Sequence, residues 1–371
     1  MTELAAPLES KQSTDWLVSA EHVVKHFPVR GSRRIGAERE VVHAVDDVSF
    51  TVRHGETLGI VGESGSGKST LARCLLGLYP VTSGKVLFDG HEITSLSTRR
   101  LRPLRREMQM VFQDPYGALN PRRRVGSIIA DPLAIHTSDS RAERRRRVQE
   151  LMERVGLNPE HYNRFPNEFS GGQRQRIGVA RALALRPKLV VCDEPVSALD
   201  VSIQAQILNL LTDLQAEFGL TYIFIAHDLS VIRHVSDRVE VMYLGKVVES
   251  GPVADIYLSP RHPYTSALLA AVPVPDPDYV DAKRRIVLTG DLPSPIHPPL
   301  GCRFNSRCPR ATEICRTEEP VLQPQLGDPP GHVAACHHPL FDGESLEPAR
   351  AVGSATTSIE TGAPPAQGNG R

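Results

Sequence analysis

The fold of this chain is indicated by a glycine-rich loop, Gly62-Glu63-Ser64-Gly65-Ser66-Gly67-Lys68-Ser69, between a strand-like segment, 56–61, and a helix-like segment, 68–76. Glycines let the backbone wrap closely around phosphates, and the amide groups and positive end of the following helix attract negative charge. Lys68 would neutralise the phosphates, and the Ser69 hydroxyl would ligate Mg²⁺. This complete Walker A motif predicts a nucleotide site formed by Gly62, Ser64, Gly65, Ser66, Gly67, Lys68, Ser69 and Thr70.

A second motif supplies two carboxylates. The apolar segment 189–192 ends in Asp193 and Glu194, which is the pattern of a Walker B strand. Asp193 would hold Mg²⁺, directly or through water. Glu194 would point toward the attacking water and act as a general base, a role that contributes about 10²- to 10⁴-fold in rate. Kinases, GTPases, recombinases and transporters all use a Walker A loop, so further motifs must identify the family.

The rest of the chain indicates one large α/β region followed by a different kind of segment. Strand-like and helical segments alternate over residues 16–260, with helices expected at 141–155 and 204–218, and predict a largely parallel sheet. Of the 30 prolines, 13 lie between Pro273 and Pro339, so residues 261–340 are expected to form a separate, loop-rich module. Residues 1–15 and 341–371 are expected to be disordered tails.

Composition restricts the partners. The 43 Lys and Arg residues balance the 43 Asp and Glu residues, so net charge gives no reason to expect nucleic acid as a partner. The run Arg141–Arg147 holds five arginines and is interpreted as a solvated helix face. No apolar stretch approaches the roughly 20 residues of a membrane span, and the N-terminal residues lack a secretory pattern. We therefore expect any membrane role to depend on partner chains.

A signature motif narrows the family. Ser170-Gly171-Gly172-Gln173 precedes Asp193 by about 20 residues, and here the chain resembles the ABC ATPase family. Other motifs of that family follow in order: Gln113 matches its Q-loop, residues 197–200 its D-loop ending in Asp200, and His227 its switch histidine. Phe27 is the candidate ring for stacking on adenine, beside an insertion around residues 28–42.

The resemblance implies a fold and a mechanism. The fold is an α/β P-loop ATPase with a RecA-like mixed sheet, an antiparallel β subdomain and a helical subdomain at about 114–185. Two ATPase subunits pair head to tail, and the signature residues Ser170, Gly171, Gly172 and Gln173 complete the ATP site of the partner. Gln113 would also ligate Mg²⁺ and report the state of the γ-phosphate. The implied catalytic residues are Lys68, Gln113, Glu194 and His227.

The C-terminal region resembles one branch of this family. Segments 261–265, 292–295, 301–304 and 307–309, with residues 114–121, resemble the second, F-type ATPase of oligopeptide, dipeptide and nickel importers. This resemblance implies a second ATPase subunit (in a homo- or heterodimer), two integral permease subunits, an extracytoplasmic peptide-binding protein and a peripheral location on the cytoplasmic face of the membrane. The alternatives are another cargo, such as nickel, or a soluble ABC ATPase of DNA repair or translation.

Six cysteines fall into two groups. Cys74 and Cys192 sit among apolar residues and are expected to fill the core. The others, Cys302, Cys308, Cys315 and Cys336, are separated by five, six and twenty residues. A reducing compartment argues against disulfides, and zinc usually takes pairs at closer spacing. The resembled branch carries a 4Fe–4S cluster here, which takes four thiolates. Spacing alone leaves a cluster, zinc or no metal open.

Three histidines lie close to the last of these cysteines. They are His332, His337 and His338, and we expect surface residues rather than metal ligands.

Overall fold

The computed structural model describes residues 15–29, 40–197, 199–271, 292–325, 327–341, 344 and 346. Almost all of the two expected tails and most of the insertion at 28–42 lie outside these residues. Within the described part of the chain, no helix combines the length and apolar composition needed to cross a bilayer.

A seven-stranded mixed sheet forms the centre of the molecule, in the order β11-β10-β9-β3-β8-β7-β6. The strands are β3 (Thr57–Val61), β6 (Met108–Val111), β7 (Leu189–Asp193), β8 (Thr221–Ala226), β9 (Arg238–Tyr243), β10 (Lys246–Pro252) and β11 (Val333–Ala334). Strands β9 to β6 are parallel, as the sequence predicts, while β10 and β11 run antiparallel. Every residue of β3, β7 and β8 is buried, which explains their continuous apolar sequences.

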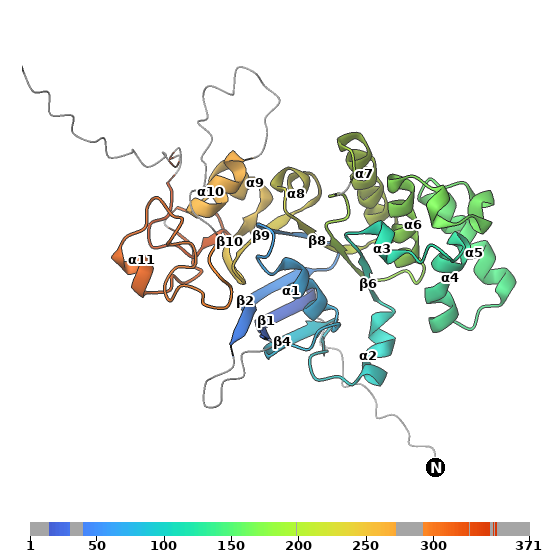
Figure 1. Cartoon of the computed structure of the whole chain (residues 1–371), viewed down its shortest axis with the longest axis horizontal. Helices are drawn as coiled ribbons and strands as arrows, with labels where there is room; N and C mark the ends of the chain where they lie inside the picture. The colour runs from blue at the N-terminus through green and yellow to red at the C-terminus, as the bar shows by residue number, and fades with distance from the viewer. Residues whose placement is uncertain are drawn as a thin grey trace, which may run out of the picture.

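A second, four-stranded antiparallel sheet has the order β2-β1-β4-β5. Its strands are β1 (Trp16–Pro28), β2 (Val41–Arg53), β4 (Ser83–Phe88) and β5 (His91–Glu92). In the sequence, α1 (Lys68–Leu75) lies between β3 and β4, and α2 (Thr98–Arg105) follows β5. Apolar side chains of β1, β2 and β4 share one core with α1 and with β3. Figure 1 shows these strands beneath α1. The antiparallel β subdomain therefore shares its core with the helix that follows the phosphate loop.

Helices gather at one end of the molecule, drawn in green in Figure 1. They are α3 (Pro115–Ala118), α4 (Val125–His136), α5 (Arg141–Arg154), the short 3₁₀ helices Pro159–Asn163 and Pro166–Glu168, and α6 (Gly171–Leu183). Arginines of α5 have local partners: Arg146 pairs with Glu143 and Glu150, and Arg147 pairs with Asp139. These pairs agree with the interpretation of the basic run as a solvated helix face.

The region after residue 261 is not separate from the ATPase core. Strand β11 pairs with β10, and Phe304 packs in the same apolar core as Tyr243 and Tyr264. Loop-rich segments cannot bury much apolar surface alone, so they use the edge of the large sheet. The remaining helices are α7 (Val201–Phe218), α8 (Leu229–Val235), α9 (Val253–Leu258), α10 (Pro263–Ala270) and α11 (Glu313–Thr317).

One histidine contradicts the sequence analysis. His332 is fully buried, and its Nε2 lies 2.8 Å from Oε1 of Glu249, which is also fully buried. The prediction of a surface residue was wrong because pairing of β11 with β10 carries the adjacent residue inside. His338 hydrogen-bonds the Thr312 hydroxyl at 2.7 Å, and His337 bonds the Glu318 carbonyl at 3.0 Å.

Candidate active site

The phosphate loop lies between β3 and α1, as predicted. Lys68 is buried, and its ammonium donates to the carbonyl oxygens of Gly62 at 2.7 Å and Glu63 at 2.8 Å. Burial lowers the pKa of Lys68, while the nearby acids Glu194 and Asp193 oppose that shift. These hydrogen bonds hold the ammonium inside the curve of the loop, where phosphate oxygens would meet it.

Gly67 shows why this loop requires glycine. Its φ is +104°, and a Cβ at this position would lie 2.0 Å from the carbonyl oxygen of Ala44. A side chain would therefore suffer both backbone strain and a clash with β2. Because of this close approach, the shape of the phosphate loop depends on the position of the segment around Ala44.

Two predicted magnesium ligands meet across the chain. The Ser69 hydroxyl donates to Oδ1 of Asp193 at 2.7 Å, although 124 residues separate them. Asp193 ends β7 with 1% exposure, and burial raises its pKa while the Ser69 hydroxyl and Arg73 counteract the shift. A hydroxyl beside a carboxylate fits Mg²⁺, which prefers oxygen ligands. The amide nitrogen of Gln113 donates to Glu194, the residue after Asp193, and the expected role of Gln113 as a Mg²⁺ ligand stays a prediction.

Three predicted catalytic residues converge at the end of β7. The Gln113 amide donates to Oε2 of Glu194 at 2.8 Å, and Nδ1 of His227 lies 3.3 Å from the same oxygen. Glu194 has a φ of +46°, and its N–H donates to Ile225 at 3.0 Å. Such a left-handed residue costs of order 1–3 kcal/mol and persists only where its surroundings hold it. Glu194 thus has partners from two segments, Gln113 after β6 and residues 225–227 at the end of β8.

The signature motif lies elsewhere in the same chain. Ser170 caps α6: its hydroxyl accepts from the Gln173 N–H, and the Gln173 side chain accepts from the Ser170 N–H. Gly171 and Gly172 pack toward Leu199 and Ile203. In the part of the chain that the structure describes, no hydrogen bond or ion pair joins residues 170–173 to the phosphate loop. Figure 1 shows α6 among the helices at one end and α1 near the middle.

The remaining nucleotide candidates are Asp200 and Phe27. The Ser197 hydroxyl donates to the carbonyl of Glu194 at 3.1 Å, and Asp200 occupies the N-cap position of α7, while Ala198 lies outside the described residues. Phe27 is partly buried near the end of β1, edge-on to Tyr79 at 5.6 Å. Its proposed stacking on adenine stays a prediction.

Comparison with known proteins identifies the family. The family model described as ABC transporter matches residues 45–197, and that described as the C-terminal region of oligopeptide/dipeptide transporters matches residues 248–315. The chain is 52% identical to the oligopeptide transport ATP-binding protein AppF of Bacillus subtilis, covering 86% of this chain and 97% of that protein. It belongs to the ABC transporter family. It is also 50% identical to the dipeptide transport ATP-binding protein DppF of Escherichia coli, covering 86% and 93%.

Solved structures agree with this assignment. A dimeric ATP-binding cassette in a post-hydrolysis state, bound to ADP and phosphate, is 31% identical with a TM-score of 0.57. It covers 64% of this chain and 99% of that cassette. This chain therefore has the ABC ATPase fold that the resemblance implied, with a mixed sheet, an antiparallel sheet and helices. The activity of this ABC ATPase is ATP hydrolysis.

Sequence reasoning missed residues that touch the phosphate loop from the C-terminal region. Arg307 forms an ion pair with Glu63, and the Tyr264 hydroxyl accepts a hydrogen bond from the Glu63 N–H. Both residues lie in segments that were noted only for their family resemblance. In the sequence, Tyr264 lies just after the ATPase core and Arg307 lies beside Cys308. Neither position indicates contact with a loop more than 200 residues earlier.

Proposed function

We propose that this ABC ATPase powers import of di- or oligopeptides. One observation carries the proposal: the ATPase core is followed by a region that matches the C-terminal model of oligopeptide/dipeptide transporters. Relatives named for oligopeptide and dipeptide transport align over nearly their whole length, which favours transport over DNA repair or translation. Nickel remains the alternative cargo.

We further propose its assembly. The Walker motifs and the signature occupy different parts of one chain, so a second ATPase subunit, identical or different, would complete each ATP site. Two integral permease subunits would receive the motion through the helical subdomain at about 114–185, and an extracytoplasmic binding protein would deliver the peptide. The complex would hold this subunit peripherally on the cytoplasmic face of the membrane.

In this proposal, each residue of the site has one task. Lys68 binds the β- and γ-phosphates, and Ser69 and Asp193 would hold Mg²⁺, which supplies charge neutralisation when bound. Glu194 accepts a proton from the attacking water. Gln113 and His227, which both contact the Glu194 carboxylate, orient it and sense the γ-phosphate.

The proposal is tested by reconstitution. The chain is expressed with the permease, ATPase and binding-protein chains of a peptide importer from the same organism, and the complex is placed in proteoliposomes. We expect copurification with the permeases and ATP-dependent uptake of labelled di- or oligopeptide. Uptake of nickel without peptide would contradict the cargo, and failure to copurify with any integral membrane chain would contradict the transport role.

We also propose that the four clustered cysteines hold a 4Fe–4S cluster. All six cysteines of the chain are free thiols. Burial and the charges of Cys302, Cys308 and Cys315 raise the pKa of Cys336 to about 12, so the four thiols act on one another electrostatically. The Cys336 thiol would therefore lose its proton only to a strongly cationic centre.

The spacing of the sulfur atoms bears on the alternative metal. Among the described residues, no three of these thiols have their sulfur atoms all within 4.8 Å of one another. Tetrahedral zinc with bonds of about 2.3 Å would need sulfurs closer than this. A bound cluster would stabilise a segment that has few helices and strands.

A further inference from the structure

We propose that the C-terminal region holds the phosphate loop in its ATP-binding shape through Arg307 and Tyr264, as positioning residues for ATP hydrolysis. Both contact Glu63, the second residue of the loop. We call Arg307, Tyr264 and Glu63 the loop clamp. The loop clamp would make ATP affinity depend on a region that lies outside the ATPase motifs.

Arg307 grips the Glu63 side chain with two hydrogen bonds. Its Nη1 lies 2.7 Å from Oε2 and its Nη2 lies 3.1 Å from Oε1, a paired geometry that fixes direction as well as distance. The Arg307 side chain is 9% exposed and that of Glu63 is 28% exposed. Pairs shielded in this way are weakened by solvent less than surface pairs are.

Tyr264 fixes the backbone at the same residue. Its hydroxyl accepts from the Glu63 N–H at 2.8 Å, and the Glu63 carbonyl accepts from the Lys68 ammonium at 2.8 Å. The Tyr264 ring is fully buried, with ring centroids 4.7 Å from Tyr243 and 5.4 Å from Phe304. The side chain, the N–H and the carbonyl of Glu63 therefore each have a hydrogen-bond partner. These contacts fix the backbone conformation at the start of the phosphate loop.

A second contact supports the opposite flank of the loop. Arg303 forms an ion pair with Asp46 and donates to the carbonyl of Leu244 at 3.3 Å. Asp46 is tied by its N–H to the carbonyl of Gly245, and the N–H of Gly245 donates to Ser66 in the loop. The C-terminal region therefore reaches the phosphate loop from both sides, directly through Arg307 and indirectly through Arg303.

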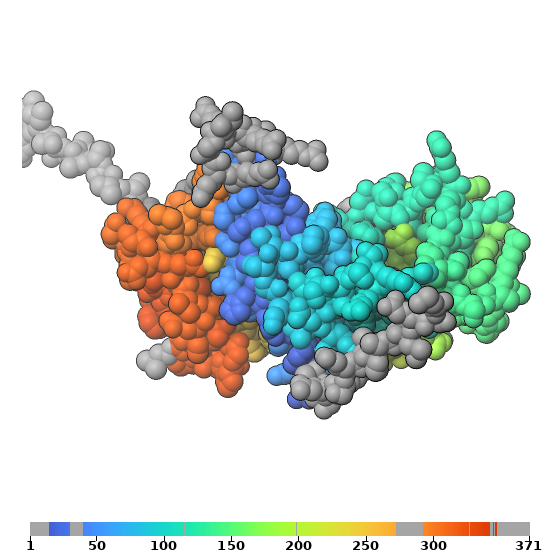
Figure 2. Space-filling model, turned by 90° about the horizontal axis from the view of Figure 1, so that it is seen from below, coloured from blue at the N-terminus to red at the C-terminus, as the bar shows by residue number. Residues whose placement is uncertain are grey.

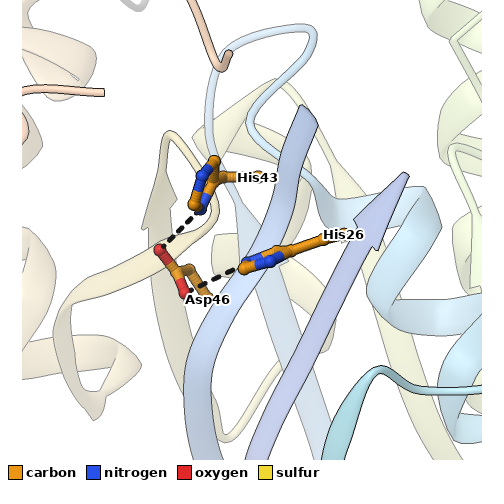
Figure 3. A group of neighbouring side chains, drawn as sticks. All are labelled: His26, His43 and Asp46. Carbon is orange, nitrogen blue, oxygen red and sulfur yellow. Dashed lines mark hydrogen bonds and ion pairs between the residues drawn. The ribbon is translucent and has the colours of Figure 1, made fainter. Parts of the chain in front are cut away.

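The surroundings of Asp46 suggest an anchor rather than a metal site. Figure 3 shows His26 and His43 both facing its carboxylate, at 3.3 and 3.4 Å. Arg303 already binds this carboxylate, and Lys246 adds a second positive charge nearby. A metal cation would have to compete with both, so we assign Asp46 to the contact with Arg303.

The consequence for function follows from preorganisation. A loop that already has the shape needed for phosphate pays less conformational entropy on binding and presents its amide groups correctly. Removing the loop clamp should weaken ATP binding while leaving Glu194, Gln113 and His227 in place. The expected effect therefore falls on affinity and KM more than on kcat.

The test measures ATP affinity and ATPase kinetics in the assembled transport complex. In Arg307→Met, we expect ATP to bind about tenfold more weakly, the usual effect of losing a hydrogen bond to a charged group, with kcat changed less than KM. Tyr264→Phe keeps the buried ring and should also weaken binding, with an unchanged melting temperature. The matched control is Arg310→Gln, which removes an arginine that pairs with Glu344 and should leave ATP affinity as in the wild type.

A double-variant cycle separates the loop clamp from general damage. If Arg307 acts through Glu63, Glu63→Gln should weaken binding, and adding Arg307→Met to it should cause little further loss. Arg307→Lys should restore part of the affinity. Unchanged affinity in both Arg307→Met and Tyr264→Phe, fully additive losses, or an equal loss in Arg310→Gln would overturn the proposal. If Arg307→Met does not fold, the isosteric Tyr264→Phe variant gives the answer.

Discussion

At the scale of single residues, Glu194 concentrates the chemistry. Its φ of +46° is unusual for a residue other than glycine, and contacts from Gln113, His227 and Ile225 hold it. The Walker B motif identifies Glu194 from the sequence. The structure adds that three contacts hold this residue in a strained backbone conformation.

Replacing Glu194 by Gln should separate ATP binding from hydrolysis. The amide keeps the shape of the side chain but accepts a proton far less readily, so turnover should fall by about 10²-fold or more. ATP should still bind, because Lys68, Ser69 and Asp193 are unchanged. Phosphate release and nucleotide binding in the purified complex measure the two effects.

A matched control for this variant is Glu160→Gln, at an exposed residue of the helical region. It should hydrolyse ATP at the rate of the wild type. Turnover of Glu194→Gln near that of the control would remove Glu194 from the role of general base.

At the scale of elements, the segment of residues 302–336 combines little regular structure with four cysteines. Cys302 and Cys315 are buried, and the Cys302 N–H donates to the carbonyl of Cys315 at 2.8 Å. Helix α11 is short, and β11 has only two residues, so regular structure contributes little to its stability. A bound cluster would add binding free energy directly to folding free energy.

Anaerobically purified protein should therefore be brown and contain about four irons per chain, the number in one 4Fe–4S cluster. Cys308→Ser should lose colour and make residues 290–340 sensitive to protease. Some ATP binding should survive, because the Walker motifs remain intact. Absorbance, metal analysis and limited proteolysis provide the measurements.

Cys74→Ala is the control for this experiment, because Cys74 lies in α1 and is buried in the other core. It should keep its iron. If the protein is colourless and contains one zinc per chain, the four cysteines bind zinc and the proposed cluster is wrong. Metal-free protein with unchanged resistance to protease would exclude both.

At the scale of the whole molecule, the Walker motifs and the signature lie in different parts of the chain, which is the basis of the proposed pairing with a second ATPase subunit. Val201, beside Asp200 at the start of α7, is 82% exposed although apolar. A probe at this position, next to the D-loop residue Asp200, would therefore be accessible to the proposed partner subunit. Figure 2 shows the N-terminal part of the chain, in blue and cyan, between the helical region in green and the C-terminal region in orange.

A photo-cross-linking residue at Val201 should form a link with the partner ATPase when ATP is bound to Glu194→Gln, and much less without nucleotide. The control position is Val321, which is 70% exposed and belongs to the C-terminal region at the opposite end from α7 (Figure 1). Equal linking at both positions, or linking that ignores ATP, would argue against a sandwich dimer. Mass spectrometry identifies the linked chains.

Much of the fold and the nucleotide site could be predicted from sequence because their determinants are local. The glycines of the phosphate loop, the apolar strand before Asp193 and the cap of α6 each lie within a few residues, and their order is typical of one family. Backbone conformation and hydrogen bonding between near neighbours give each motif its shape. Ser69 and Asp193 were expected at one Mg²⁺ site because the Walker A and Walker B motifs assign both residues to that ion.

Only the tertiary structure showed how the C-terminal region joins the site. Arg307 and Glu63 are 244 residues apart, Tyr264 and Glu63 are 201 apart, and His332 and Glu249 are 83 apart. These side chains meet where β11 pairs with β10 and where Phe304 packs in the core shared by Tyr243 and Tyr264. Such contacts depend on which edges and faces pack together, and no local pattern of residues encodes that choice.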